Sequence, residues 1–165
     1  MISIDLLKGF EDRIASIQKR KPAKVIKMKL PEEYKQVIAM YIKEENEILF
    51  NDLLFDKTNE VDLMAALFHE MRHAYQWNQI TNKKSSTEPI NLLDEWEEEF
   101  HLNLQPTNNQ NDNYYKRLIE IDAIAYADLN IKNIYQTSLD IPIEIKSDVL
   151  TRESEIKHNK DIIKL

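Results

Sequence analysis

A chain of 165 residues with 42% hydrophobic content is long enough to form one domain around a single core and too short for two ordinary domains. Its formal charge of −7 removes the broad positive surface on which general nucleic-acid binding depends, so we expect no DNA or RNA partner. The absence of cysteine and the presence of only one glycine exclude disulfides, thiolate zinc ligands, cysteine nucleophiles and glycine-rich phosphate loops.

The first part of the chain is predicted to hold a helix, two strands and a further helix between them. Apolar residues recur three and four positions apart over residues 2–20, which is typical of an amphipathic helix. Lysines alternate with apolar residues over Lys24–Leu30, ahead of Pro31, and this pattern indicates an edge strand. We expect a helix over Glu32–Lys43 and a second strand over Glu47–Phe50.

The strongest helical pattern of the chain begins at Asn59 and continues to about Ile80. Asn59 is a suitable N-cap, and Glu60 and Asp62 are acidic residues of the kind that favour a first turn. Apolar residues recur on more than one side of this helix, so we expect it to be largely buried. After a polar loop, the apolar residues of Ile90–Phe100 predict a further helix with an acidic outer face.

The remainder of the chain contains one clear helical pattern followed by a weaker one. We expect a loop over Gln105–Asn113 and a helix over about Tyr114–Asn130. Beyond this helix, Ile141–Ile145 is predicted to be extended, and Ser147–Lys164 is predicted to be either helical or loosely attached. These elements together indicate an α+β fold that is mostly helical, with a small sheet before the helix that begins at Asn59.

A sequence motif with metal-binding chemistry lies inside that helix. Residues 67–75 read LFHEMRHAY, which places His69, Glu70 and His73 in an HExxH arrangement. Histidines four positions apart on a helix differ by about 40° around its axis and by roughly 6 Å between β-carbons, so both imidazoles can bind one cation. Glu70 stands about 100° from His69, which suits a general base better than a third ligand. The alternative is a chance spacing of two histidines.

A catalytic zinc ion needs a third protein ligand and one open position. The extended metzincin motif is excluded, because Gln76 stands where that motif has glycine and Gln79 where it has histidine. Glu120 shares a helix face with Ala123 and Ala127, whose small side chains allow two helices to approach closely. We therefore predict Glu120 as the third ligand, against the alternative of a solvent-facing glutamate on an alanine-rich helix.

Several other side chains are weaker candidates for a role at this site. An acidic run is better explained as a solvated helix face, and Asp122 is about 200° from Glu120 on the helix, which favours an outer or capping role. Tyrosine hydroxyls could stabilise an oxyanion, but tyrosines of amphipathic helices lie more often at the edge of a core, and we nominate none. The rivals for the third ligand are Asp94, Glu95, Glu97, Glu98, Glu99, His101 and Asp122, and the tyrosines are Tyr75, Tyr114, Tyr115 and Tyr126.

At these residues the chain resembles the gluzincin-type HExxH metallopeptidases and, more narrowly, the small ImmA/IrrE-like family of bacterial and mobile-element peptidases. The matching segments are HEMRHAYQ at 69–76 and EIDAIAYA at 120–127, and the resemblance covers about residues 24–130. In that family the first glutamate of the second segment completes the zinc site, which implies that role for Glu120. Length and composition predict a single domain over residues 1–165, and the resemblance implies a zincin-like metallopeptidase core over about 24–130 and assigns nothing to residues 131–165.

These observations predict a zinc-dependent peptidase in which His69, His73 and Glu120 bind Zn²⁺ and Glu70 is the general base. The expected partner is a protein or peptide substrate held in extended form by the strand near Ile48–Phe50. The resemblance implies limited proteolysis of an intracellular regulator. Two alternatives stay open, namely a catalytically silent zinc-binding regulatory or interaction module and a helical interaction protein without any ion.

We expect neither a membrane-spanning segment nor a signal peptide. No stretch approaches the ~20 uninterrupted apolar residues needed to cross a bilayer. The first residues carry acids where a signal peptide would have a basic start. The chain is therefore predicted to be cytoplasmic, without a membrane partner.

Overall fold

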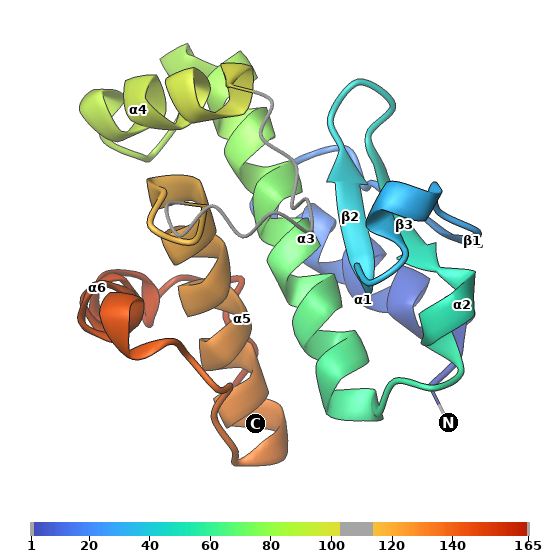
Figure 1. Ribbon diagram of the computed structural model, residues 1–165. Helices are drawn as coiled ribbons and strands as arrows, with labels where there is room; N and C mark the ends of the chain where they lie inside the picture. The colour runs from blue at the N-terminus through green and yellow to red at the C-terminus, as the bar shows by residue number, and fades with distance from the viewer. Residues whose placement is uncertain (1, 103–113, 165) are drawn as a thin grey trace.

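Long helix α3 lies between a small sheet on one side and two further helices on the other (Figure 1). The computed structural model describes residues 2–102 and 114–164. This arrangement confirms the predicted α+β fold with a small sheet before the HExxH helix. In chain order the elements are α1 (Ile4–Gln18), β1 (Lys24–Met28), the 3-10 helix η1 (Glu32–Tyr34), β2 (Ala39–Ile42), β3 (Glu47–Asn51), α2 (Asp52–Phe55), α3 (Glu60–Thr81), the 3-10 helix η2 (Lys83–Ser85), α4 (Ile90–His101), α5 (Leu118–Tyr135) and α6 (Ile143–Ile156).

The sheet has its strands in the order β1-β3-β2. Central strand β3 runs parallel to β1 and antiparallel to β2, so that Ile48 stands opposite Val25 on one side and Tyr41 on the other. Ile48 and Phe50 are fully buried, because alternate residues of a strand point to the same face and this face meets the helices. β1 is an edge strand, as its lysines predicted, and β2 forms the other edge among the described strands.

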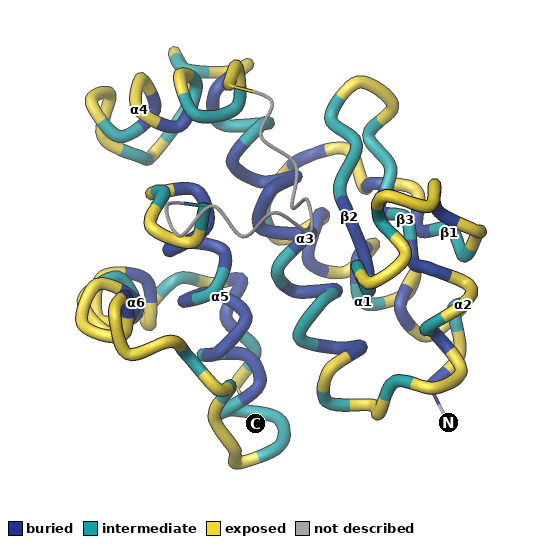
Figure 2. Tube along the Cα trace, in the orientation of Figure 1, coloured by how far each residue is buried: buried dark blue, intermediate teal, exposed yellow. Residues whose placement is uncertain are grey.

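Both ends of the chain contribute to one hydrophobic core. Leu7 and Ile14 of α1 belong to the same cluster of buried side chains as Ile145 and Val149 of α6. Buried positions are concentrated along α3 and α5, where these two helices pack against each other, and α6 packs on α5 (Figure 2). The C-terminal part of the chain is therefore integrated into the fold that carries the HExxH helix.

Three of the predicted helices are confirmed with small shifts in their bounds, namely α1, α3 and α4. Asn59 caps α3 as predicted, because its side chain accepts a hydrogen bond from the backbone N–H of Asp62. α1 ends at Gln18, after which Lys19 adopts the left-handed backbone conformation that closes many helices. No helix within residues 2–102 and 114–164 is both long and apolar enough to cross a membrane.

Helix α5 begins at Leu118 rather than at Tyr114, where the sequence pattern starts it. The carboxylate of Glu99 accepts hydrogen bonds from the backbone N–H groups of Leu118 and Ile119, at 3.1 and 2.9 Å. A side chain from α4 thus caps the first turn of α5, which a pattern within the α5 segment cannot show. The predicted loop at Gln105–Asn113 lies outside the described residues.

The predicted helix over Glu32–Lys43 is wrong. Only the short turn η1 is helical there, and Ala39–Ile42 forms strand β2 paired with β3. The buried amide of Asn51 donates hydrogen bonds to three backbone carbonyls of the connecting segment, those of Tyr34, Lys35 and Val37. These bonds and the pairing with β3 provide hydrogen-bond partners for backbone groups that would otherwise be paired within a helix. Tertiary contacts therefore determine the conformation of this segment.

The predicted extended segment Ile141–Ile145 is also wrong in its second half, because α6 begins at Ile143 directly after Pro142. Proline fixes φ near the helical value. It also lacks a backbone N–H, and an N–H at the start of a helix has no hydrogen-bond partner within the helix, so proline suits this position. The prediction of a helix farther along is confirmed as far as Ile156. After the helix, Ile162 is buried in the core, so the end of the described chain is packed against the fold.

Helix α1 contains a buried acidic residue, Glu11, which the apolar pattern of the helix does not predict. The carboxylate of Glu11 is fully buried and binds both terminal nitrogens of Arg20, at 2.6 and 2.7 Å. The same carboxylate accepts a hydrogen bond from the backbone N–H of Ala23. Glu11 therefore ties the end of α1 to the chain that enters β1.

We expect Glu11→Ala to destabilise the protein by about 3–5 kcal/mol, because it leaves the Arg20 guanidinium buried without its partner. Urea unfolding followed by circular dichroism measures this change. The exposed neighbour provides the control, since Asp12→Ala should change the free energy of unfolding by no more than about 0.5 kcal/mol. Equal midpoints for the two variants would contradict the role assigned to Glu11.

Candidate metal centre

Helix α3 presents the two histidines of the HExxH motif on one face, one turn apart. His73 is buried, and His69 is partly exposed at the rim of the site. Their Nε2 atoms lie 3.0 Å apart. The two nitrogens thus face each other, as the four-residue spacing predicts for a pair that binds one ion.

Helix α5 brings Glu120 to these histidines. Glu120 lies in the first turn of α5 and is buried, with 3% of its surface exposed. Ala123 and Ala127 on the same helix are completely buried, in agreement with a closely packed face of small residues. α5 and α3 pack along each other, so a short carboxylate side chain is long enough to reach the imidazoles.

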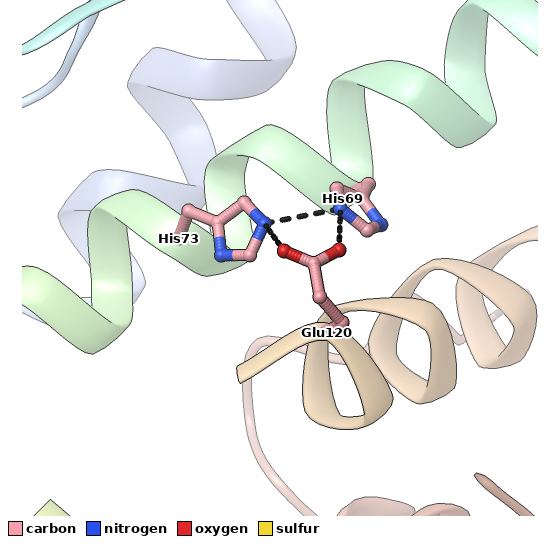
Figure 3. Close-up of side chains that lie close together, drawn as sticks. All are labelled: His69, His73 and Glu120. Atoms are coloured by element: carbon pink, nitrogen blue, oxygen red, sulfur yellow. Dashed lines mark hydrogen bonds and ion pairs between the residues drawn. The ribbon is translucent and has the colours of Figure 1, made fainter. Parts of the chain in front are cut away.

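The three side chains point toward one another from the two helices (Figure 3). One carboxylate oxygen of Glu120 lies 3.2 Å from Nε2 of His69, and the other lies 3.4 Å from Nε2 of His73. Donor atoms held about 2.0–2.1 Å from a tetrahedral zinc ion lie roughly 3.3 Å from one another. The observed separations of 3.0–3.4 Å are close to that value but involve both oxygens of Glu120. With one ligand atom taken from each residue, the atoms of His69, His73 and Glu120 lie within 4.8 Å of one another, so the group could hold a metal ion.

The electrostatics of the group also suit a cation. Burial alone would lower the pKa of His73, but the adjacent Glu120 carboxylate raises it to about 9. Burial would raise the pKa of Glu120, yet the two imidazoles hold it well below its ordinary value. The ionised carboxylate supplies the negative charge that a divalent cation needs, and a bound cation would displace the proton that the raised pKa keeps on His73.

Glu70 lies beside the three donors and outside their group. Burial raises the pKa of its carboxyl, and the nearby His69 and His73 oppose that rise. The backbone N–H of Tyr41 in β2 donates a hydrogen bond to this carboxylate. The Glu70 carboxylate therefore lies between α3 and strand β2, and it is not part of the group of side chains that could hold a metal ion.

A cleft opens onto the metal centre between β2 and the two helices. Its walls come from β2 and the residues after it, from α3, from the end of α4 and from the start of α5. The strand that borders the cleft is β2, whereas the predicted strand near Ile48–Phe50 is the central strand β3, so that prediction of the substrate-binding strand is wrong. The lining residues include Tyr41, Lys43, Glu70, His73, Phe100, Tyr114, Arg117 and Glu120.

The rival ligands have other partners or lie in solvent. Asp94 and Glu97 bind Lys83 at 2.7 and 2.6 Å, and Glu99 caps α5. Asp122 is buried and binds Arg72 and Arg152, in agreement with the expectation, from its angle to Glu120 around the helix, that it is not a metal ligand. Glu95, Glu98 and His101 are exposed, as expected for a solvated helix face.

Two polar residues near the centre were missed as functional candidates. The sequence pattern singles out no tyrosine, yet the structure places Tyr114 in the cleft, where burial and the carboxylates of Glu120 and Glu70 raise its pKa. The sequence distinguishes Gln76 only as a departure from the metzincin motif, whereas in the structure its side chain contacts His73. The position of Gln76 three residues after His73, on the same helix face, is the signal that could have indicated this contact.

Comparisons with family models, curated proteins and solved structures found no match to this chain. The arrangement of side chains at the metal centre is therefore the basis on which a function can be proposed.

Proposed function

We propose that this protein is a zinc-dependent peptidase of the gluzincin type, with His69, His73 and Glu120 as metal ligands and Glu70 as general base. The observation that carries the proposal is the convergence of three side chains from two helices, whose ligand atoms lie within 4.8 Å of one another, beside a buried carboxylate that is not one of them. The segments that resemble the ImmA/IrrE-like peptidases, at 69–76 and 120–127, are the ones that supply these residues. A bound zinc ion would polarise the scissile carbonyl and acidify a water molecule.

Glu70 handles the proton in this reaction. Its carboxylate oxygen takes a proton from the attacking water and later donates that proton to the nitrogen of the departing amine. Burial raises the pKa of this carboxyl toward neutral pH, which suits a group that must both accept and release a proton. The hydrogen bond from the Tyr41 N–H holds the carboxylate in place at the cleft wall.

Strand β2 supports a peptide as the substrate class. The Tyr41 N–H points away from β3 toward the cleft, and backbone groups alternate in direction along a strand, so Ala39 also directs its backbone groups outward. An extended peptide can pair with such an edge and lie across the metal centre. The partner we propose is therefore a protein or peptide chain, with limited cleavage of a regulatory protein as the narrower proposal.

The proposal is tested by the metal content and hydrolytic activity of the purified protein. We expect about one zinc ion per chain after purification without added metal. Cleavage of an unfolded protein substrate should disappear with a chelator and return on addition of zinc. A protein that neither contains zinc nor binds added zinc would overturn the proposal.

Tyr114 is expected to stabilise the oxyanion that forms on the substrate carbonyl. Its raised pKa keeps the proton on the hydroxyl, so it remains a hydrogen-bond donor in the cleft. Tyr114→Phe should lower kcat on the order of 100-fold with little change in zinc content, since loss of one oxyanion donor has effects of that size. The adjacent and half-exposed Tyr115 provides the control, because Tyr115→Phe should leave kcat unchanged. A Tyr114→Phe enzyme with normal kcat would remove Tyr114 from the mechanism.

A further inference from the structure

A buried set of hydrogen bonds leads from His73 away from the metal centre. Nδ1 of His73 lies 2.8 Å from Oε1 of Gln76, on the side of the ring opposite Nε2. The amide nitrogen of Gln76 lies 2.9 Å from the backbone oxygen of Ile119 and 2.7 Å from the carboxylate of Asp122. Gln76 is completely buried, so water does not compete for these bonds.

The orientation of the Gln76 amide follows from its partners. The Ile119 carbonyl and the Asp122 carboxylate can only accept hydrogen bonds, so the NH₂ group of Gln76 must face them. Its oxygen then faces His73, and because that oxygen can only accept, Nδ1 of His73 must carry a hydrogen. The bond thus selects Nε2 of His73 as the nitrogen available to a cation, on the side where Glu120 lies.

Two arginines hold Asp122 in position. Arg72 of α3 donates to both carboxylate oxygens, at 2.7 and 3.0 Å, and Arg152 of α6 donates to one of them at 2.7 Å. Because guanidinium groups can only donate, both carboxylate oxygens of Asp122 are acceptors, and one of them also accepts from the Gln76 amide. The set of bonds extends over α3, α5 and α6.

Gln76 also connects the two helices that supply the metal ligands. It lies on α3 with His73, and its bond to Ile119 reaches the residue directly before Glu120 on α5. One side chain thus restrains the ring of one ligand and the backbone beside the other. Outer hydrogen bonds of this kind orient metal-binding imidazoles and raise their affinity for the ion.

We propose that Gln76 is a positioning residue of the metal centre: held by Asp122 and its two arginines, it orients His73 so that Nε2 faces the cation. The inference rests on the function proposed above, because it concerns the same zinc ligands. The HExxH motif ends at His73, so the role of Gln76 is inferred from its contacts in this structure.

The test compares Gln76→Met with Gln79→Met. Methionine keeps the approximate length of glutamine and removes its hydrogen bonds. Gln79, three positions farther along α3, accepts a bond from Ser86 and has none to the metal centre. We expect zinc affinity, measured by competition with a chromophoric chelator, to fall 10–100-fold in Gln76→Met and to stay unchanged in Gln79→Met. The absorption bands of the cobalt-substituted protein should also shift in Gln76→Met alone.

Nitrogen NMR of the zinc-loaded wild-type protein provides a test that does not depend on whether a variant folds. We expect His73 to bind the ion through Nε2 and to show a slowly exchanging proton on Nδ1. Coordination through Nδ1, or equal zinc affinities in Gln76→Met and wild type, would overturn the positioning role while leaving the metal centre intact. A wild-type protein that binds no zinc would instead overturn the metal centre, and the inference with it.

Discussion

Glu120→Ala is expected to remove zinc from the purified protein almost completely. Glu120 is the only carboxylate among the three converging donors, so the change deletes one ligand and the negative charge that partly balances a dication. Loss of an outer hydrogen-bond partner weakens metal affinity about 10–100-fold, and loss of a ligand should exceed the upper end of that range. Elemental analysis and chelator competition measure the two quantities.

The matched control for this change is Glu98→Ala. Glu98 is an exposed glutamate of α4, so its removal alters the net charge equally without affecting the centre. Its zinc content should equal that of the wild type. If Glu120→Ala also keeps its zinc, the ion is held by residues other than those assigned to it.

The second large effect is expected from Glu70→Gln, which should bind zinc normally and lose turnover by about 10²–10⁴-fold. Glutamine occupies nearly the same volume as glutamate but cannot accept the proton of the attacking water. Because Glu70 is not one of the three converging donors, the metal should stay in place. Measurement of kcat and zinc content on the same preparation separates these two properties.

The control for Glu70→Gln is Glu44→Gln, which changes an exposed carboxylate that lines the same cleft. That variant should retain its kcat. Glu70→Gln protein that hydrolyses substrate at the normal rate would exclude Glu70 as the base. A wild-type protein that binds zinc and hydrolyses no peptide would favour the alternative of a silent zinc-binding module.

The local geometry of the candidate site could be predicted from the sequence. The side chains of His69, Glu70 and His73 are arranged by the pitch of one helix, and the N-cap that starts this helix is also encoded locally at Asn59. The choice of Glu120 followed from the small residues on its own helix face, although its distance from the histidines depends on how α5 packs against α3.

Other features depend on contacts between distant segments. β2 was predicted as a helix, because its strand conformation requires β3 as a partner and the amide of Asn51 as a support for the preceding chain. The burial of the Glu11 carboxylate likewise depends on Arg20, which lies beyond the end of α1, so the apolar pattern of that helix cannot predict it.

The sequence by itself determined that two imidazoles and a carboxylate lie on one capped helix, because spacing along a helix converts directly into direction around its axis. Tertiary structure alone decided that β2 borders the cleft, that Tyr114 enters it, and that Gln76 joins His73 to Asp122 and the arginines. Each of these contacts joins separate elements whose relative positions result from packing and hydrogen bonding of the whole chain, which no local pattern contains.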